Sequence, residues 1–531
     1  MWTEILLYVV MCNITPADFF NFSEQIEKLT AHHGKPSSLA SIFHSASRSI
    51  CFLDKYTSCF ENLGCISTTE EWYHHTYRPK NLEPLDRHTI KTEFHFITKP
   101  SDTTGTLKFD LVNTKNGSDL SFSECGKHPN LIVLIHDFTS NGRTGWIKHI
   151  ASTLLQSSSP SIISVDWQAG AEPPFEQAVS NARVVALEAI SLLKSLKGSN
   201  QRVYLIGHGL GAHIAGYVGH SHAVDKITGL DPTGPYFEHM PAVVRLDESD
   251  AKFVEVLHTD GFSGRSQGTQ TSMGHVDFFI NGAEHQPHCN DTSSFPPLHK
   301  LDRNSLKEGD ILPACSHKRS FKYFIEAANQ EDCEYIGFQC NSYEEFQEGK
   351  CTECEREHGT CAKFGPNEVE SDKKPSNYFL HTAGTSPYCM YSYRVEMVFD
   401  DRSGTSQQNG NFEMIMIGEN GILTTAYASN CGSPASFKAA SPYVMIYYAK
   451  PPVVTHIIEV RLKWIHNGNA ICFFCKTSMY VNKVNIQQVS MKNPKTVENY
   501  MCPKYSSEIK SGSYITFTEC EGAKHQGHKS F

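Results

Sequence analysis

The 531-residue sequence lacks three features that would each mark a particular class of protein. No stretch approaches the roughly eighteen consecutive apolar residues of a transmembrane helix. No short repeat or biased tract dominates, which excludes collagen-like, coiled-coil and low-complexity chains. Positive charge is also in deficit, with 47 Lys and Arg against 57 Asp and Glu. This balance argues against a nucleic-acid partner, because that function needs a clustered basic face.

Cysteine, by contrast, is plentiful, with 18 residues, and it bears on the compartment. Such a number fits either a secreted chain with disulfides or an intracellular chain with metal sites. The zinc-like pair is Cys472-x-x-Cys475, which lies in the apolar run AICFFC and has no second pair to complete a tetrahedral set. We therefore favour disulfides or buried thiols over zinc at these two residues.

The first residues favour secretion. The apolar run 5–12 is about as long as the h-region of a signal peptide, although Glu4 precedes it and no basic residue does. We predict a signal peptide over residues 1–17, with an ordinary buried segment or an imperfect gene start as the alternatives. N-glycosylation sequons, which fit the same route, occur at Asn13, Asn21, Asn116 and Asn290.

Residues 85–325 carry the pattern of an α/β domain. Continuous apolar runs, which suit strands buried on both faces of a parallel sheet, occur at 131–136, 161–167, 202–207, 226–231 and 252–258. Between the second and third runs, apolar residues recur at three- and four-residue steps and predict a helix over 174–197. This alternation predicts a mostly parallel sheet with helices on both faces.

Beyond about residue 388 the pattern becomes alternating. Apolar side chains at 393, 395, 397 and 399, and again at 458, 460, 462 and 464, are separated by polar neighbours. Half-buried antiparallel strands have this pattern, so a C-terminal β-sandwich is predicted. The polar stretch 365–384, which contains Pro and Gly, is predicted to be a linker.

One local pattern points to catalysis but lacks the atom that would react. The strand RVYLIG leads into GHGLG (207–211) and then into a predicted helix, which is the context of a nucleophile elbow. The central residue of that turn should be Ser, and here it is Gly209. Asp231 and His317 follow in the chain order of an α/β-hydrolase triad, in which a carboxylate orients an imidazole.

A second match to the elbow motif is a coincidence of letters. Residues 264–268 (GRSQG) satisfy G-x-S-x-G, but they follow no strand directly and precede Thr-Gln-Thr-Ser rather than a helix. We do not expect Ser266 to be a nucleophile.

Ordered motifs along most of the chain resemble the pancreatic lipase family. They are SCFENLGCIS (58–67), IHDF (135–138), ISVDW (163–167), IGHGLGAHIAG (206–216), ITGLDP (227–232), VRLDESDA (244–251), MGHVDFFING (273–282) and CSHKRSFKYF (315–324). The resemblance covers roughly 50–520. It is weaker in the C-terminal region, which is similar to the family's PLAT domain and where EVRLKW (459–464) supports the match. It implies an α/β hydrolase domain over 51–384 and a PLAT-like antiparallel β-sandwich over 385–523. An N-terminal extension (18–50) and a tail (524–531) flank them.

The resemblance assigns a role to each residue of the predicted site. Asp231 and His317 match the triad acid and base, and Gly209 stands in the place of the nucleophile. The backbone N–H groups of Phe138 and Leu210 match the oxyanion-hole donors.

A structural calcium site is implied as well. Its ligands would be the carbonyls of Ala242 and Arg245 and the side chains of Asp247 and Asp250, and oxygen ligands of this kind suit Ca²⁺. The alternative is an ordinary acidic turn.

Five disulfides also follow from the resemblance. The implied pairs are Cys59–Cys65, Cys289–Cys315, Cys340–Cys351, Cys354–Cys361 and Cys502–Cys520. The second of these closes the loop that corresponds to the family's lid. If Cys12 leaves with the signal peptide, seven cysteines remain, so at least one is free or pairs with another chain. They are Cys51, Cys125, Cys333, Cys389, Cys431, Cys472 and Cys475.

Three departures from the family pattern bear on activity. Gly209 has no hydroxyl to attack an ester carbonyl, and loss of a serine nucleophile costs about 10⁶ in kcat. Asp137 stands where the family usually has Gly, and its carboxylate would oppose the charge that an oxyanion hole stabilises. The lid residues 295–312 are highly charged, lack Trp and follow the Asn290 sequon, whereas a lid that meets lipid should have a broader apolar face.

These features favour a secreted lipase-fold protein that has lost hydrolysis and binds lipid or a similar apolar ligand, or that serves as a storage protein. The alternative is an active triacylglycerol lipase or phospholipase, which the retained Asp231, His317 and calcium pattern supports. A third class is an interaction protein whose PLAT-like domain contacts a lipid–water interface or a partner protein.

Overall fold

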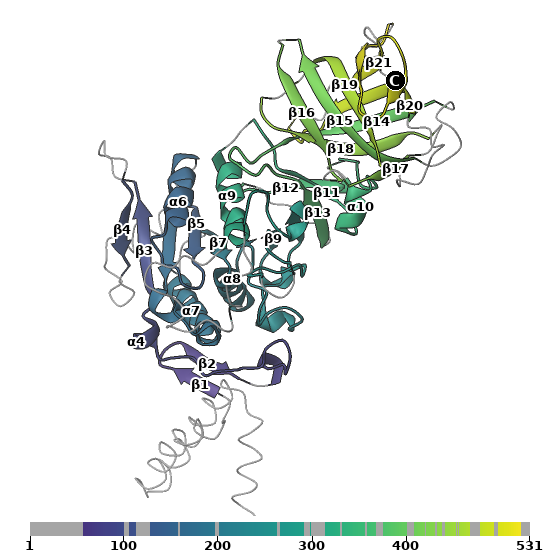
Figure 1. Ribbon diagram of the computed structural model, residues 1–531. Helices are drawn as coiled ribbons and strands as arrows, with labels where there is room; N and C mark the ends of the chain where they lie inside the picture. Colours follow the sequence, from purple (N-terminus) through teal and green to yellow (C-terminus); the bar gives the residue numbers. More distant parts are fainter. Residues whose placement is uncertain are drawn as a thin grey trace, which may run out of the picture. The chain divides into compact units, whose positions relative to one another are not determined.

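The computed structural model of the chain divides into two units, Met1–Thr57 and Ser58–Phe531, and the fold described below belongs to the second (Figure 1). The residues that the structure describes are 57–68, 70–99, 106–112, 128–157, 160–196, 201–262, 266–290, 298, 314–329, 332–355, 358–367, 375–400, 408–419, 421–430, 433–437, 441–452, 454, 456–467, 478–492 and 498–521. The predicted signal peptide, the 18–50 extension, the Cys472–Cys475 run and the tail lie outside them. Within these ranges no helix is long and apolar enough to cross a membrane.

An eleven-stranded sheet forms the α/β domain, in the order β12-β11-β13-β10-β9-β8-β7-β5-β6-β3-β4. The strands are β3 (Glu93–Thr98), β4 (Lys108–Leu111), β5 (Asn130–Ile135), β6 (Ser161–Asp166), β7 (Arg202–His208), β8 (Lys226–Leu230), β9 (Phe253–His258), β10 (Val276–Ile280), β11 (Ile336–Gln339), β12 (Cys361–Lys363) and β13 (Ser376–Leu380). In this spatial order, neighbouring strands are parallel in the central part of the sheet, from β13 through β10, β9, β8, β7 and β5 to β6. The pairings outside it, at both edges, are antiparallel. The predicted parallel sheet is confirmed, and its five apolar runs correspond to β5 through β9.

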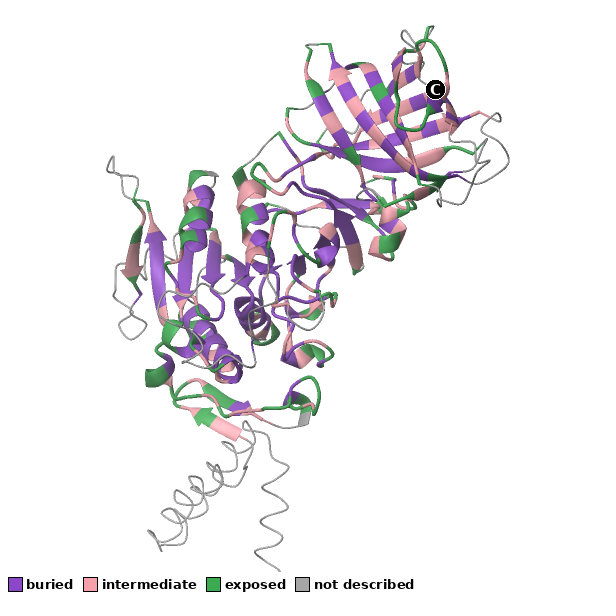
Figure 2. Ribbon diagram, viewed as in Figure 1, coloured by how far each residue is buried: buried purple, intermediate pink, exposed green. Residues whose placement is uncertain are grey.

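Helices cover both faces of this sheet, as predicted (Figure 1). On one face, α7 (Phe175–Ser195) and α8 (Leu210–Ser221) bury side chains such as Ala182 and Ile214 against the strands. On the other face, α6 (Gly145–Ser157) and α9 (Cys315–Asn329) contribute Trp146 and Phe324 to a second core. Figure 2 shows the central strands buried throughout, which explains why their sequences are continuously apolar.

Shorter elements complete the α/β domain. They are a two-stranded sheet of β1 (Thr57–Phe60) and β2 (Gly64–Ser67), the helices α4 (Arg87–Ile90) and α10 (Tyr343–Gln347), and the 3₁₀ helices η1 (Glu70–Trp72), η2 (Gln168–Ala171), η3 (Ala242–Val244), η4 (Glu248–Asp250) and η5 (Asn281–Ala283).

The predicted linker at 365–384 is wrong for part of its length. Residues 376–380 form β13, which pairs in parallel with β10 and antiparallel with β11. Tyr378, Phe379 and Leu380 are buried there. This apolar triplet is too short to stand out among polar neighbours, and only its pairing inside the sheet makes it a strand.

The C-terminal region is antiparallel, as predicted, and its sheet closes on itself. The strand order is β14-β18-β16-β15-β19-β23-β21-β20-β22, with β17 on β15 and a further pairing of β14 with β20. The strands are β14 (Tyr391–Phe399), β15 (Gln408–Gly418), β16 (Leu423–Ala428), β17 (Ala435–Phe437), β18 (Tyr443–Ala449), β19 (Ile457–His466), β20 (Ser478–Gln488), β21 (Glu498–Pro503), β22 (Glu508–Lys510) and β23 (Tyr514–Glu519). Alternate residues point into one core, in which Met414 and Trp464 are fully buried.

The described residues contain six disulfides. All five predicted pairs form: Cys59–Cys65, Cys289–Cys315, Cys340–Cys351, Cys354–Cys361 and Cys502–Cys520. The sixth, Cys333–Cys389, joins two cysteines that sequence analysis left unassigned. Five of the unassigned cysteines lie outside the described residues, namely Cys51, Cys125, Cys431, Cys472 and Cys475.

Candidate functional site

The elbow is formed as predicted, at the turn between β7 and α8. Gly209 has φ +56° and ψ −118°, a conformation that favours glycine. Its backbone N–H donates to the carbonyl of Leu230 at 3.1 Å, which ties the turn to the end of β8. Gly207 lets the strand and helix approach closely, because a Cβ there would overlap the backbone of Gly211. The turn therefore has the geometry of a nucleophile elbow, with no side chain at its tip.

Asp231 and His317 meet in front of this turn, as the sequence predicted. Asp231 directly follows β8 and has φ +46°, which is unusual for a non-glycine residue and typical of functional sites. Its Oδ1 accepts hydrogen bonds from the backbone N–H groups of Thr259 (2.7 Å) and Asp260 (3.1 Å). Its Oδ2 lies 2.5 Å from Nδ1 of His317, in the first turn of α9. The carboxylate therefore orients the imidazole.

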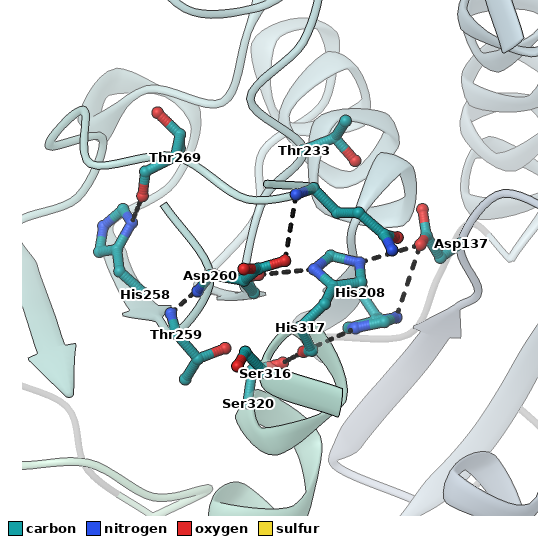
Figure 3. Close-up of polar contacts among 12 residues, drawn as sticks. Asp137, His208, Thr233, His258, Thr259, Asp260, Thr269, Ser316, His317 and Ser320 are labelled. Carbon is teal, nitrogen blue, oxygen red and sulfur yellow. Dashed lines mark hydrogen bonds and ion pairs between the residues drawn. The ribbon is translucent and has the colours of Figure 1, made fainter. Parts of the chain in front are cut away.

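The carboxylate of Asp137 fills the space in front of Gly209. A Cβ built on Gly209 would overlap both carboxylate oxygens. Oδ1 of Asp137 accepts a 2.7 Å hydrogen bond from the backbone N–H of Leu210, and Oδ2 lies 3.0 Å from Nε2 of His317 (Figure 3). One side chain thus lies where a serine hydroxyl and the oxyanion of its substrate would both bind. The sequence predicted a carboxylate beside the oxyanion-hole donors, but not that it would fill the space in front of Gly209.

Charge in this cluster is distributed as an ion pair. Burial alone would raise the pKa of Asp137, but the hydrogen bond and charge of His317, with smaller effects from His208 and Leu210, lower it to about 2. Burial alone would lower the pKa of His317, but hydrogen bonds and charges from Asp137 and Asp231 raise it to about 10. At neutral pH His317 is therefore protonated and cannot accept a proton as a general base.

The backbone around Asp137 is held by its neighbours. Nδ1 of His136 donates to the carbonyl of Asp137 at 2.8 Å, and Nε2 of the same ring accepts from the backbone N–H of Trp167 at 3.0 Å. The indole N–H of Trp167 donates to the carbonyl of His136 at 2.9 Å. The backbone N–H of Thr139 donates to the carbonyl of Ala171 at 2.8 Å. These bonds position Asp137 at the elbow rather than leaving it on a free loop.

A cavity of about 490 Å³ opens beside the cluster. Asp137, His208 and His317 form part of its wall together with the aromatic rings of Trp146 and Phe321. Phe138, the second predicted oxyanion donor, also lines it. Sequence analysis treated His208 only as part of the elbow motif, although its place directly before the turn is the signal that brings its ring to the cavity.

Comparison with known proteins agrees with this geometry. Residues 56–388 match the sequence family described as Lipase. Inactive pancreatic lipase-related protein 1 of Homo sapiens is 31% identical over 479 residues, covering 87% of this chain and 96% of the relative. Pancreatic lipase-related protein 2 of Myocastor coypus is 33% identical over 386 residues, covering 68% and 77%. Pancreatic triacylglycerol lipase of Cavia porcellus is 32% identical over 366 residues, covering 65% and 75%.

The chain belongs to the pancreatic lipase family. The elbow turn, Asp231 and His317 lie together in this chain, and the carboxylate of Asp137 occupies the space that a side chain at residue 209 would need.

The predicted calcium ligands of this lipase-family chain lie on one loop. Oδ2 of Asp250 accepts from the N–H of Asp247 at 2.9 Å, and Nη1 of Arg245 lies 3.2 Å from Oδ2 of Asp247. The carbonyl of Ala242 accepts from the N–H of Arg245 at 3.1 Å. Burial above all, and then the charge of Asp247, raise the pKa of Asp250 to about 8. A buried carboxylate that is short of positive charge fits a cation bound through oxygen atoms.

Two further predictions concern loops near the site. Ser266 lies between β9 and β10, and the hydrogen bonds described for the His317 ring go to Asp137 and Asp231. The lid loop closed by Cys289–Cys315 falls outside the described residues at 291–297 and 299–313. Of this loop, Leu298 is buried against the core, and the sequon residue Asn290 is exposed.

Proposed function

We propose that this chain is a secreted lipase-family protein that has lost ester hydrolysis and binds a lipid or similar apolar ligand. The observation that carries the proposal is the Asp137 carboxylate in front of Gly209. Acyl transfer needs a nucleophile, a neutral base and free oxyanion donors. Gly209 supplies no nucleophile, His317 holds a proton at neutral pH, and the N–H of Leu210 already donates to Asp137.

The retained cavity supports a binding function. Its volume of about 490 Å³ lies within the range of small-ligand sites, about 300–1,000 Å³. Trp146, Phe138 and Phe321 offer apolar surface for an acyl chain, and Gln267 and Lys318 offer polar groups that can orient a headgroup. Relatives named inactive pancreatic lipase-related protein 1 support the loss of hydrolysis, and six disulfides support secretion.

The test compares wild type with three variants: Gly209→Ser, Asp137→Gly, and the double variant that carries both. Hydrolysis of p-nitrophenyl butyrate and of trioctanoin is measured for each. Gly209→Ser alone should stay inactive, because its side chain overlaps Asp137. The double variant should hydrolyse these esters at least about 100-fold faster than wild type. This is a small part of the about 10⁶ in kcat that a serine nucleophile contributes in an intact site.

Controls separate this site from other sources of activity. His317→Ala in the double variant should abolish the gain, whereas Ser266→Ala should leave it unchanged. Hydrolysis by the wild type that disappears with His317→Ala would show that the chain is an active esterase and overturn the proposal. Binding is measured separately with a fluorescent fatty-acid probe, which Phe321→Asp should weaken by at least about tenfold. A probe that binds wild type and this variant equally would remove the cavity as the ligand site.

We also propose that the loop of Asp247 and Asp250 binds a structural Ca²⁺ ion. The two carboxylates and the carbonyls of Ala242 and Arg245 supply its oxygen ligands. Saturating Ca²⁺, at about 100 times its Kd, should raise the unfolding free energy by about 2.7 kcal/mol, and Asp250→Asn should remove this gain. An equal effect of Ca²⁺ on wild type and Asp250→Asn would assign the turn to structure alone.

The C-terminal domain offers a surface for a lipid–water interface, and we propose that it binds there. Leu423 and Tyr427 lie on the same face of β16 and are 55% and 60% exposed. The double substitution Leu423→Ser with Tyr427→Ser should reduce co-flotation with phosphatidylcholine vesicles. Lys510→Ser, at the exposed end of β22, is the control. Unchanged flotation would contradict a lipid contact through β16.

A further inference from the structure

His208 and His317 both turn a ring nitrogen toward the same oxygen of Asp137 (Figure 3). Nε2 of His317 lies 3.0 Å from Oδ2 of Asp137, and Nδ1 of His208 lies 3.9 Å from that oxygen. The second distance is too long for a hydrogen bond. One possible ligand atom from each of Asp137, His208 and His317 lies within 4.8 Å of the others, and all three residues are buried. The loss of hydrolysis does not explain why His208 faces Asp137.

Contacts behind each ring determine which nitrogen faces Asp137. Nε2 of His208 lies 3.3 Å from the carbonyl of His317, which can only accept, so this nitrogen carries the hydrogen. In the neutral ring, Nδ1 of His208 then directs a lone pair at a carboxylate oxygen. Nδ1 of His317 donates to Asp231 at 2.5 Å in the same way, which leaves Nε2 of His317 for Asp137.

The spacing and the supporting contacts match those of a zinc site. Zn²⁺ binds imidazole nitrogen and carboxylate oxygen at about 2.0–2.2 Å, which places tetrahedral ligands about 3.4 Å apart. The observed 3.0 and 3.9 Å lie on either side of that value. Metal-binding histidines also donate their other N–H to a carboxylate or a carbonyl. Asp231 accepts this hydrogen bond from His317, and the backbone carbonyl of His317 accepts it from His208.

The cavity gives such an ion an entry path and an open coordination position. Asp137, His208 and His317 all line its wall, so an ion between them can keep a water molecule on the cavity side. A fully enclosed cluster would offer no such route.

We propose that Asp137, His208 and His317 form a binding site for one Zn²⁺ ion at the floor of the cavity. The hydrated ion enters and exchanges water ligands for Oδ2 of Asp137, Nδ1 of His208 and Nε2 of His317. The proton between His317 and Asp137 leaves to solvent, so one ion replaces one proton. This site goes beyond the proposed loss of hydrolysis, and esterase assays and zinc binding can each fail without the other.

The test titrates ZnCl₂ into the chelator-treated full chain by isothermal calorimetry, in two buffers of different ionisation enthalpy. Wild type should bind one Zn²⁺ with a Kd of about 1 µM or tighter and release about one proton. Asp137→Asn and His208→Gln should each weaken the affinity for Zn²⁺ by more than about 10–100-fold. That range is the loss expected when a residue that only hydrogen-bonds a metal ligand is removed. Gln at 208 keeps an N–H donor for the His317 carbonyl, so this variant should fold.

Controls separate this site from the other histidines of the chain. His358→Gln changes an exposed ring 2.7 Å from Glu355 and should bind Zn²⁺ like wild type. Co²⁺ in place of Zn²⁺ should show visible d–d absorption with wild type and lose it with His208→Gln. The proposal is overturned if wild type binds no Zn²⁺, or if both site variants bind it as tightly as wild type. Circular dichroism checks that each variant is folded. If Asp137→Asn does not fold, the Zn²⁺ affinity of His208→Gln by itself decides the proposal.

Discussion

Two buried histidine–aspartate clusters lie in the α/β domain, and among the described residues the elbow cluster lines the cavity beside Gly209 whereas the other, His258 with Asp277, has no exposed surface. On β9 and β10, Nε2 of His258 lies 2.8 Å from Oδ1 of Asp277, and both residues are fully buried. Nδ1 of His258 bonds the carbonyl of Thr269, and the Asp277 carboxylate accepts the N–H groups of Met273 and Gly274. Every polar atom of this pair that the structure describes has a partner inside the protein.

The elbow cluster differs in two ways. His317 lies between two carboxylates, Asp137 and Asp231, rather than beside one, and the Asp137 end of the cluster faces a cavity. A buried His–Asp pair is therefore no sign of function by itself, because His258 and Asp277 form one with a structural role. What distinguishes the elbow cluster is the extra carboxylate and access to solvent or ligand.

The largest difference between the clusters should appear in stability. His258→Ala removes the ring that Asp277 bonds at a fully buried position, which costs about 3–5 kcal/mol. His317→Ala should cost less, about 1–3 kcal/mol, because water in the cavity can reach Asp137. Urea unfolding at pH 7 measures both. Equal losses would mean that access to the cavity does not relieve the elbow cluster.

The next largest effect should be on the pH dependence of stability. His317 has a pKa of about 10 when folded, above the ordinary 6.5, so its stabilisation is complete below pH 6.5 and is lost as pH rises through 10. Between these values His317 makes the free energy of unfolding fall as pH rises. Asp137 has a pKa of about 2, below the ordinary 3.8, so its stabilisation is present above pH 3.8 and is lost as pH falls through 2.

Asp137→Asn should flatten the alkaline slope, because His317 loses one of its two carboxylates. Urea unfolding from pH 6.5 to 10 measures the effect. The control is His381→Gln, since burial lowers the pKa of His381 to about 4 and that ring stays neutral over the whole interval. If Asp137→Asn keeps the wild-type slope, Asp137 does not hold the proton on His317.

The smallest effect concerns the space in front of Gly209. Gly209→Ala and Gly512→Ala both place a side chain at positive φ, which costs about 1–2 kcal/mol. At Gly512 the new Cβ meets nothing within 4 Å, whereas at Gly209 it overlaps Asp137. Gly209→Ala should therefore lower the free energy of unfolding by about 1–3 kcal/mol more than Gly512→Ala does. In an Asp137→Gly background that excess should vanish, and its persistence would show that another group limits the space.

Sequence reasoning predicted the parts of the fold that local patterns determine. Strands buried on both faces appear as continuous apolar runs, so β5 through β9 were recognisable, whereas β13 is a five-residue strand within polar surroundings. Cysteine spacing does not determine pairing, which is why Cys333–Cys389, 56 residues apart, needed the structure.

The residues of the candidate site were named from the sequence, but the way in which their side chains pack together was not. Chain order and motif context identified Gly209, Asp231 and His317, because turn chemistry and strand ends are local properties. The position of Asp137 depends on contacts with Leu210 and His317, which are 73 and 180 residues away in the sequence. The partnership of His208 with the same carboxylate is likewise a tertiary property.

The overlap between Asp137 and residue 209 also has a consequence for any attempt to rebuild a hydroxyl at the elbow. A side chain at 209 and the carboxylate of Asp137 compete for one volume. A single Gly209→Ser substitution therefore meets a carboxylate, and a serine hydroxyl with free space around it requires a second substitution, at residue 137.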